Sequence, residues 1–258
     1  MKKLLSILIL SFLFFLTSCG KKEAEPNTLD KIINRNLLIA GVKQDAGPFG
    51  FLNEKGELEG FDIDVAKYIA KNLTGSEKNV KFVTVTSNTR IEAVTSGEVD
   101  MVIATMTNTE SRRYLVDFSI PYYVAGQTAM VPDDSKIYTF SDLKDKTTIV
   151  VLGSTSEQNL RRVIPTARIV GYSDYKEAFK ALKDGKGDAL STDDTIISGF
   201  ISKNEGYRAL KNRISTEHYS IGIKQTDDKC LKQSLDSIIT EMKNNGTLKH
   251  LKEKWDLI

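Results

Sequence analysis

One pattern occurs twice in this sequence and constrains the fold more than any other feature. Segments 97–102 (GEVDMV) and 185–190 (GKGDAL) each place a helix-ending glycine and an Asp ahead of an apolar strand. Counted from the two glycines, Thr105 falls opposite Asp193. Strand–helix–strand units this short favour a parallel sheet with crossover helices. The chain is therefore expected to hold two similar α/β units, each delivering a polar residue at the end of a strand.

The segment from Met101 to Arg112 predicts a ligand site. An apolar strand runs into a tract rich in hydroxyl groups, and Arg112 then lies just inside the expected start of a helix. Strands that turn polar at their carboxyl ends commonly do so where a ligand binds. We interpret Arg112 as binding a carboxylate, with Thr105 and Thr107 beside it. The alternative is an arginine solvated on the first turn of a helix.

The N-terminus has the pattern of an export signal. A charged start precedes the apolar run Leu4–Leu16, which is shorter than the about 20 residues that span a bilayer. The residues up to Cys19 resemble the bacterial lipobox, which implies a signal peptide over 1–18 and a lipid, with palmitate, on Cys19. An ordinary signal peptide with a chance cysteine is the alternative. Residues 19–28 are expected to form a flexible tether.

Composition excludes several classes of protein. The 36 Lys and Arg are balanced by 34 Asp and Glu, so nothing suggests a nucleic-acid partner. There is no second long apolar run, which argues against a transmembrane domain. Cys230 is the only cysteine besides Cys19, so no intramolecular disulfide is expected in the mature chain, and Cys230 is expected to pack as a small apolar residue.

Other charged residues allow two interpretations each. Asp62 and Asp64 open an amphipathic helix, where capping is favoured over metal binding. Ser154 and Glu157 fit a capping box, and the amides of that turn could instead bind an anion. Lys43 follows an apolar strand, and this position by itself favours an orientation to solvent over one into a cleft.

Five motifs in order give the chain a family resemblance. It resembles, over about residues 29–258, the polar amino-acid-binding proteins of bacterial ABC importers, in extracellular solute-binding protein family 3. Three further segments, 41–45, 87–90 and 191–195, look most like the glutamate- and aspartate-binding branch. The five motifs are 60–66 (GFDIDVA), 97–100 (GEVD), 107–112 (TNTESR), 117–123 (DFSIPYY) and 188–193 (DALSTD).

The resemblance implies the type II periplasmic-binding-protein fold. This α/β fold has two lobes, each a mixed, mostly parallel sheet flanked by helices, with the ligand cleft between them. Residues 29–124 and 220–258 are expected in lobe 1 and residues 125–219 in lobe 2, with crossings near 122–126 and 217–222.

The resemblance also assigns the residues that bind the amino-acid backbone of the ligand. Arg112 is expected to bind the α-carboxylate, helped by the amides of Thr107 and Thr155. Asp193 is expected to bind the α-ammonium, with Thr105 supplying its carbonyl and Thr107 its hydroxyl. A planar guanidinium meets a carboxylate through two hydrogen bonds, and a buried ammonium requires a counter-charge.

A charge count decides the expected side chain of the ligand. Lys43 and Arg90 occupy positions that meet the distal carboxylate in the acidic-ligand branch, and Tyr175 matches a pocket tyrosine. With Arg112 they give three cations against Asp193. Because unpaired buried charge is costly, glutamate or aspartate is expected as ligand, with glutamine or another polar amino acid as the alternative.

The expected function is that of a monomeric extracytoplasmic receptor. It would capture a free amino acid by lobe closure and deliver it to an ABC permease and its ATPase, while the lipid on Cys19 holds it at the membrane. No enzyme activity, cofactor or metal is expected. The rival is a dehydratase of cyclohexadienyl acids on the same fold, which needs a positioned acid or base in the cleft.

Overall fold

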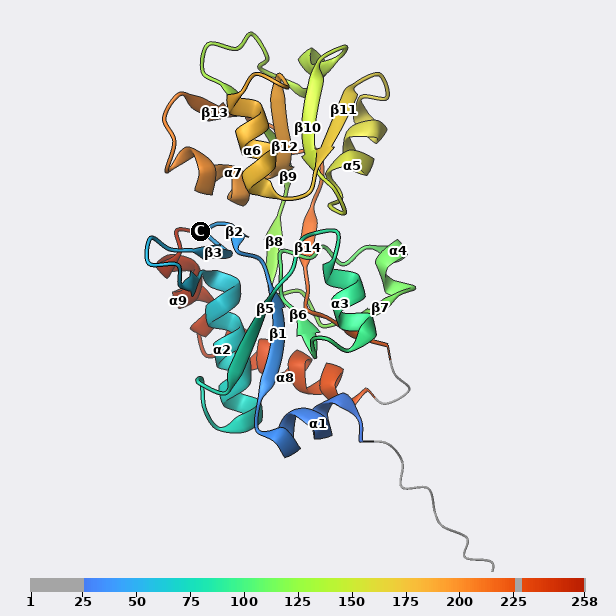
Figure 1. Ribbon diagram of the computed structural model, residues 1–258, viewed down its shortest axis with the longest axis vertical. Helices are drawn as coiled ribbons and strands as arrows, with labels where there is room; N and C mark the ends of the chain where they lie inside the picture. Colours follow the sequence, from blue (N-terminus) through green and yellow to red (C-terminus); the bar gives the residue numbers. More distant parts are fainter. Residues whose placement is uncertain (1–25, 226–228, 258) are drawn as a thin grey trace, which may run out of the picture.

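The computed structural model describes residues 26–225 and 229–257 and consists of two stacked α/β lobes (Figure 1). Each lobe is organised around a mixed five-stranded sheet. The lobe 1 sheet has the order β5 (Val80–Thr84), β1 (Leu38–Val42), β6 (Met101–Val102), β15 (Gly222–Lys224) and β7 (Val116–Phe118). The lobe 2 sheet has the order β11 (Arg168–Tyr172), β10 (Thr147–Val151), β12 (Ala189–Asp193), β9 (Gln127–Pro132) and β13 (Tyr207–Ala209). The expected two-lobed α/β fold is confirmed.

The two sheets repeat one topology. In each, the first three strands pair in parallel and the last two pairings are antiparallel. Short strands complete the architecture, β8 (Tyr123–Ala125) paired with β14 (Glu217–Tyr219), and β2 (Asp45–Ala46), β3 (Gly50–Leu52) and β4 (Leu58–Glu59) as a small sheet. The β8–β14 ribbon runs between the lobes, as Figure 1 shows.

Amphipathic helices cover both sheets. In α2, apolar side chains one turn apart, such as Val65 and Ile69, are fully buried, and Gly75 ends the helix in the left-handed conformation (φ 84°). Lobe 1 carries α1 (Thr28–Arg35), α2 (Phe61–Thr74), α3 (Arg90–Ser96), α4 (Glu110–Arg113), α8 (Cys230–Asn244) and α9 (Thr247–Lys254). Lobe 2 carries the 3-10 turn η1 (Phe140–Leu143), α5 (Ser156–Val163), α6 (Tyr175–Lys183) and α7 (Asp194–Ile201).

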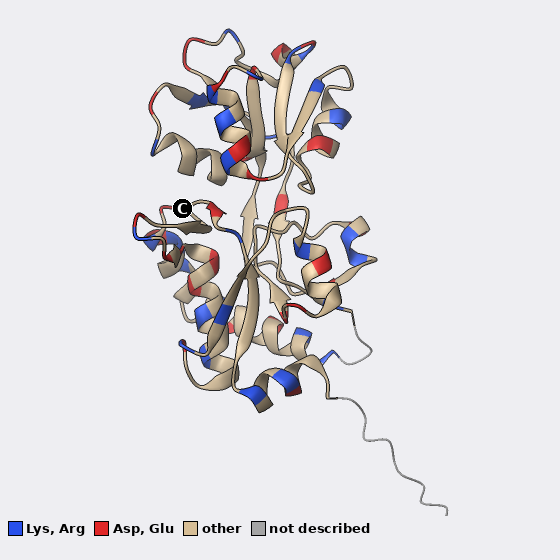
Figure 2. Cartoon of the chain, viewed as in Figure 1, with Lys and Arg blue, Asp and Glu red and all other residues tan. Residues whose placement is uncertain are grey.

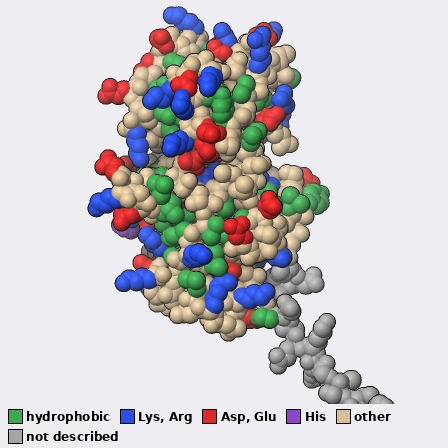
Figure 3. All heavy atoms as spheres, in the orientation of Figure 1, with side chains coloured by type: hydrophobic (Ala, Val, Ile, Leu, Met, Phe, Trp, Pro, Cys, Tyr) green, Lys and Arg blue, Asp and Glu red, His purple; other side chains and the backbone are tan. Residues whose placement is uncertain are grey.

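The largest buried apolar cluster continues from lobe 1 through the crossing ribbon into lobe 2. Phe49 makes edge contacts with Phe61, Tyr123 and Tyr219, with ring centroids 5.1–5.8 Å apart. The crossing is therefore part of a packed core. Side chains fill most of the space between the lobes on the face shown in Figure 3.

Three local expectations are wrong or lie outside the described residues. Cys230 begins α8 on the protein surface, so it does not pack as a small core residue. The capping box at Ser154 and Glu157 does not form, because α5 starts at Ser156 and Glu157 pairs with Arg161 (2.9 Å). The signal peptide (1–18), the lipidation site Cys19 and most of the tether lie outside the described residues. Across those that are described, no helix combines the length and apolarity needed to cross a membrane.

Candidate functional site: a buried charged cleft between the lobes

The predicted site residues follow the carboxyl ends of strands that face each other across the cleft. Lys43 follows β1, and Asp193 ends β12 on the opposite side. The structure brings Lys43, Arg90, Thr105, Thr107, Arg112, Tyr175 and Asp193 together as buried residues, each between 2% and 8% exposed, and Thr155 as a half-buried one. All eight predicted residues thus line one interlobe region.

Both arginines of lobe 1 donate to the same carbonyl of lobe 2. Arg112 donates to the carbonyl of Thr107 (2.8 Å) and to that of Gly153 (2.9 Å). Arg90 donates to the carbonyls of Ala104 (2.7 Å) and Thr105 (3.2 Å) and, more weakly, to Gly153 (3.4 Å). Burial, and then the charge of Arg90, lower the pKa of Arg112 to about 9. The carbonyl of Gly153 supplies partial negative charge where two buried cations converge.

Local structure fixes the place of Arg112. Thr109 caps α4 by accepting a hydrogen bond from the amide of Arg112 (3.3 Å), which starts the short helix immediately after the hydroxyl-rich tract. The predicted helix start is confirmed, and Arg112 is buried, which contradicts the alternative of a solvated arginine.

Lys43 points into the cleft and is buried, so the orientation to solvent favoured by its position after a strand is wrong. Its ammonium donates to the hydroxyl of Thr105 (2.9 Å) and lies 4.5 Å from the ring centroid of Tyr175 in lobe 2. Burial, together with the charge of Arg90, lowers the pKa of Lys43 to about 7 despite opposing effects of Asp45, Asp193 and Asp62.

Asp193 is the buried acid on the lobe 2 side. Its carboxylate accepts a hydrogen bond from the hydroxyl of Tyr219 in the crossing ribbon. Burial, and then the nearby Glu217, raise the pKa of Asp193 to about 7. A ligand ammonium at this carboxylate would stabilise the ionised form.

Two buried acids of the site were not predicted from the sequence. Glu217 accepts hydrogen bonds from Thr155 (3.1 Å), Asn159 (2.8 Å) and Ser215 (2.5 Å). Asp62, expected to cap α2, is fully buried and accepts from the amide of Thr105 (3.1 Å), so the capping assignment is wrong. Asp62, between Phe61 and Ile63 at a helix start, had the pattern of a helix-start acid, and Glu217, between Thr216 and His218, had no pattern that distinguished it from a surface acid.

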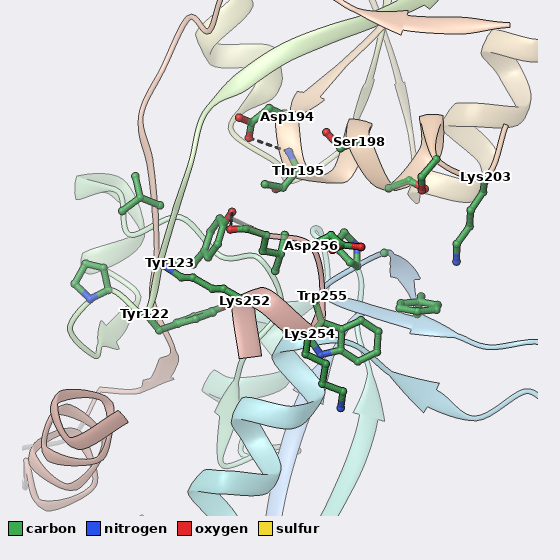
Figure 4. Close-up of a pocket in the computed structure, with 18 of the residues that line it drawn as sticks. Tyr122, Tyr123, Asp194, Thr195, Ser198, Lys203, Lys252, Lys254, Trp255 and Asp256 are labelled. Atoms are coloured by element: carbon green, nitrogen blue, oxygen red, sulfur yellow. Dashed lines mark hydrogen bonds between the residues drawn. The ribbon is translucent and has the colours of Figure 1, made fainter. Parts of the chain in front are cut away.

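Cavities border the lobes at several places. One, of about 810 Å³, is lined by residues that include Gln44, Asp45 and Lys176 but by none of the eight predicted residues. Another, of about 550 Å³, is lined by residues that include Thr107, Thr155 and Glu217. A larger one, of about 830 Å³, lies between α7 and the end of α9 (Figure 4) and contains none of the eight predicted residues. We place the site at the buried charges and not in either larger cavity, because only the former presents buried ionised groups from both lobes at the strand ends.

Outside this cleft, charge is dispersed. Figure 2 shows Lys and Arg interspersed with Asp and Glu on both lobes. The described residues contain no group of three or more His, Cys, Asp or Glu side chains that could hold a metal ion.

Two α/β lobes, a two-stranded crossing and a charged cleft define the class of two-lobed binding proteins. The chain belongs to the bacterial extracellular solute-binding proteins, family 3, whose model matches residues 38–257. Membership of this family places it outside the cytoplasm.

Known relatives are named as amino-acid receptors. The ABC transporter glutamine-binding protein GlnH of Bacillus subtilis is 39% identical, covering 99% of this chain and 97% of its own. The glutamine-binding protein of Geobacillus stearothermophilus is 47% identical, and the match covers 81% of this chain and 80% of that protein. The solved cysteine-binding protein of Campylobacter jejuni is 33% identical with a TM-score of 0.85, covering 89% and 93%.

Proposed function

We propose that this protein is the substrate-binding receptor of an amino-acid ABC importer and that its ligand is L-glutamine. The observation that carries this proposal is a balance of buried charge at the cleft. Three basic side chains, Lys43, Arg90 and Arg112, and three acids, Asp62, Asp193 and Glu217, are buried there. The pKa values of Lys43 and Asp193 are both about 7, so partial ionisation reduces one positive and one negative charge alike. A ligand of zero net charge preserves that balance.

The charge count made from the sequence set three cations against Asp193 alone, which favoured an acidic ligand. Asp62 and Glu217 remove that excess. Glutamate or aspartate would bring a further negative charge into a site with little solvent to screen it, which costs on the order of several kcal/mol when unpaired. The names of the two glutamine-binding relatives support the same ligand.

In the proposed complex, Arg112 exchanges the carbonyl of Gly153 for the α-carboxylate, which accepts two charge-assisted bonds. The amides of Thr107 and Thr155 assist, and Asp193 takes the α-ammonium together with Thr105. Lys43, Arg90 and Tyr175 surround the side-chain amide. Closure is favoured because the ligand contacts both lobes.

A second candidate is L-glutamate. It is favoured by Arg90, whose buried Nε has no hydrogen-bond partner within the described part of the chain. The distal carboxylate of glutamate, placed near Lys43 and Arg90, would accept a stronger hydrogen bond from Arg90 than the amide oxygen of glutamine would.

Delivery to a permease and its ATPase follows from the importer role. We further propose that cleavage before Cys19 and lipidation of that residue hold the receptor at the outer face of the cell membrane. Mass spectrometry of the protein extracted from membranes would show a diacylglycerol adduct on the peptide that begins at Cys19. A soluble, unmodified mature chain would overturn this part of the proposal.

Calorimetric titration tests the ligand. The mature protein, unfolded and refolded to remove bound amino acids, is titrated with Gln, Glu, Asp, His and Arg. We expect Gln to bind at least about tenfold more tightly than Glu. Tight binding of Glu with no response to Gln would reject glutamine and support the second candidate.

A further inference from the structure

Asp62 is a buried acid at a helix start, a position typical of a helix cap, but its side chain contacts Thr105 in the cleft. It is the second residue of α2, where acids commonly cap a helix. The amides of Phe61 and Asp62, however, donate to the carbonyls of Pro48 and Phe49 (both 2.9 Å). The helix start is thus satisfied by backbone, and the carboxylate of Asp62 is available for other partners.

Thr105 connects that carboxylate to both Lys43 and Arg90, the two cations expected to meet the ligand side chain. The carboxylate accepts from the amide of Thr105 (3.1 Å) and from the hydroxyl of Tyr122 (2.9 Å). Thr105 in turn accepts from Lys43 through its hydroxyl and from Arg90 through its carbonyl. Thr105 has a φ of 46°, which is uncommon for a β-branched residue, so these partners hold an unfavourable backbone conformation.

The surroundings of Asp62 affect its pKa in opposite directions. Burial raises its pKa to about 6, while the hydrogen bonds from Tyr122 and Thr105 and the charges of Lys43 and Arg90 act in the opposite direction. The carboxylate is therefore ionised at neutral pH. Charges in such a site are poorly screened, so each one affects the affinity for a charged ligand.

On the basis of the proposed function, we propose that Asp62 is the specificity-determining residue that excludes acidic amino acids. Its carboxylate compensates Lys43 and Arg90 without touching the ligand, so a neutral amide side chain is accepted. Without this charge, the two cations would favour a distal carboxylate.

The test compares dissociation constants for Gln and Glu in three variants. In Asp62→Asn, the ratio of the Glu constant to the Gln constant is expected to fall at least about tenfold. Asp64→Asn is a matched change in the same helix, at a half-buried carboxylate that accepts from Lys254 (2.7 Å) and Trp255 (2.9 Å) and from no residue of the cleft. In this variant the ratio stays at the wild-type value. Tyr122→Phe removes a hydrogen bond that favours the ionised form of Asp62. At pH 8, where the carboxylate stays charged, this variant is expected to weaken both ligands equally.

The measured ratios distinguish an electrostatic effect of Asp62 on the ligand from a purely structural support of Thr105. If Asp62→Asn weakens Gln and Glu by the same factor, Asp62 only braces Thr105 and the proposal is wrong. If Asp62→Asn does not fold, Lys43→Met is compared with the double variant Asp62→Asn/Lys43→Met. The double variant is expected to bind Glu relatively better than Lys43→Met alone, and equal ratios would overturn the proposal. A wild-type protein that prefers Glu would reject the proposed ligand, whereas an unchanged ratio in Asp62→Asn rejects only the role of Asp62.

Discussion

The two lobes contribute different groups to the cleft, because all three cations come from lobe 1, which also holds Asp62. Lobe 1 supplies Lys43, Arg90 and Arg112, which are already bonded to hydroxyl and carbonyl groups of their own lobe. Lobe 2 supplies Asp193 and the carbonyl of Gly153, whose partners come from lobe 1 or the crossing ribbon. The difference indicates that lobe 1 is organised to bind a carboxylate before closure, whereas the lobe 2 groups acquire their partners when the lobes meet.

The largest expected effect tests the lobe 1 side. Arg112→Ala should weaken every amino acid at least about a hundredfold, because it removes the fork that binds the α-carboxylate common to all of them. Arg113→Ala, which affects an exposed arginine bonded to Asn108 (2.6 Å), is the matched control and should bind normally. Calorimetry with Gln checks both variants. Retained binding in Arg112→Ala would mean that the backbone carboxylate is bound elsewhere.

A smaller effect is expected where the lobes touch at Gly153. A Cβ at this position would lie 2.6 Å from the Cα of Asn88 and 2.6 Å from the carbonyl oxygen of Ser87 in lobe 1. Gly153→Ala should therefore oppose closure and weaken Gln about tenfold or more. Small-angle X-ray scattering should show less compaction on adding Gln than in the wild type.

Gly185→Ala separates this clash from backbone strain. Gly153 and Gly185 have nearly equal positive φ values, 75° and 70°, but a Cβ at Gly185 meets nothing within 4 Å among the described atoms. The strain of alanine is thus similar in both variants, and only Gly153→Ala blocks the contact between the lobes. Equal losses of affinity in the two variants would show that strain, not closure, is responsible.

The pH dependence of binding tests Asp193 on the lobe 2 side. Its pKa is raised to about 7 by burial and by Glu217, and ligand ammonium binds only its ionised form. The affinity for Gln should therefore fall as pH decreases through 7, by at most about tenfold per pH unit. Lys43, Tyr219 and Asp194 also act on this carboxylate, so the comparison with Asp193→Asn is needed.

Asp193→Asn should bind weakly, and the fall in affinity for Gln as pH decreases through 7 should be much smaller than in the wild type. The same raised pKa has a consequence for stability, because the contribution of Asp193 to folding is present below its ordinary pKa and is lost as pH rises through about 7. The ligand-free Asn variant should therefore melt higher than the wild type at pH 8. A steep pH dependence that persists in Asp193→Asn would assign it to another group, such as Lys43.

The two-lobed fold was expected from the family resemblance of five sequence motifs. The sequence itself determined the repeated strand–helix–strand units and the positions of Arg112 at a helix start and of Asp193 at a strand end. These follow from hydrophobic periodicity and from a repeated spacing, both of which are local along the chain. Lys43 was ambiguous, since an exposed and a buried lysine look alike after a strand.

Only the tertiary structure decided the charge of the cleft. Asp62 reaches Thr105 across 43 residues of sequence, and Glu217 reaches Thr155 across 62. Electrostatic energy depends on distance in space and on the loss of solvent, and neither can be read from neighbouring residues. A helix-start acid and a crossing-strand acid therefore appeared to be surface groups until packing placed them beside three buried cations.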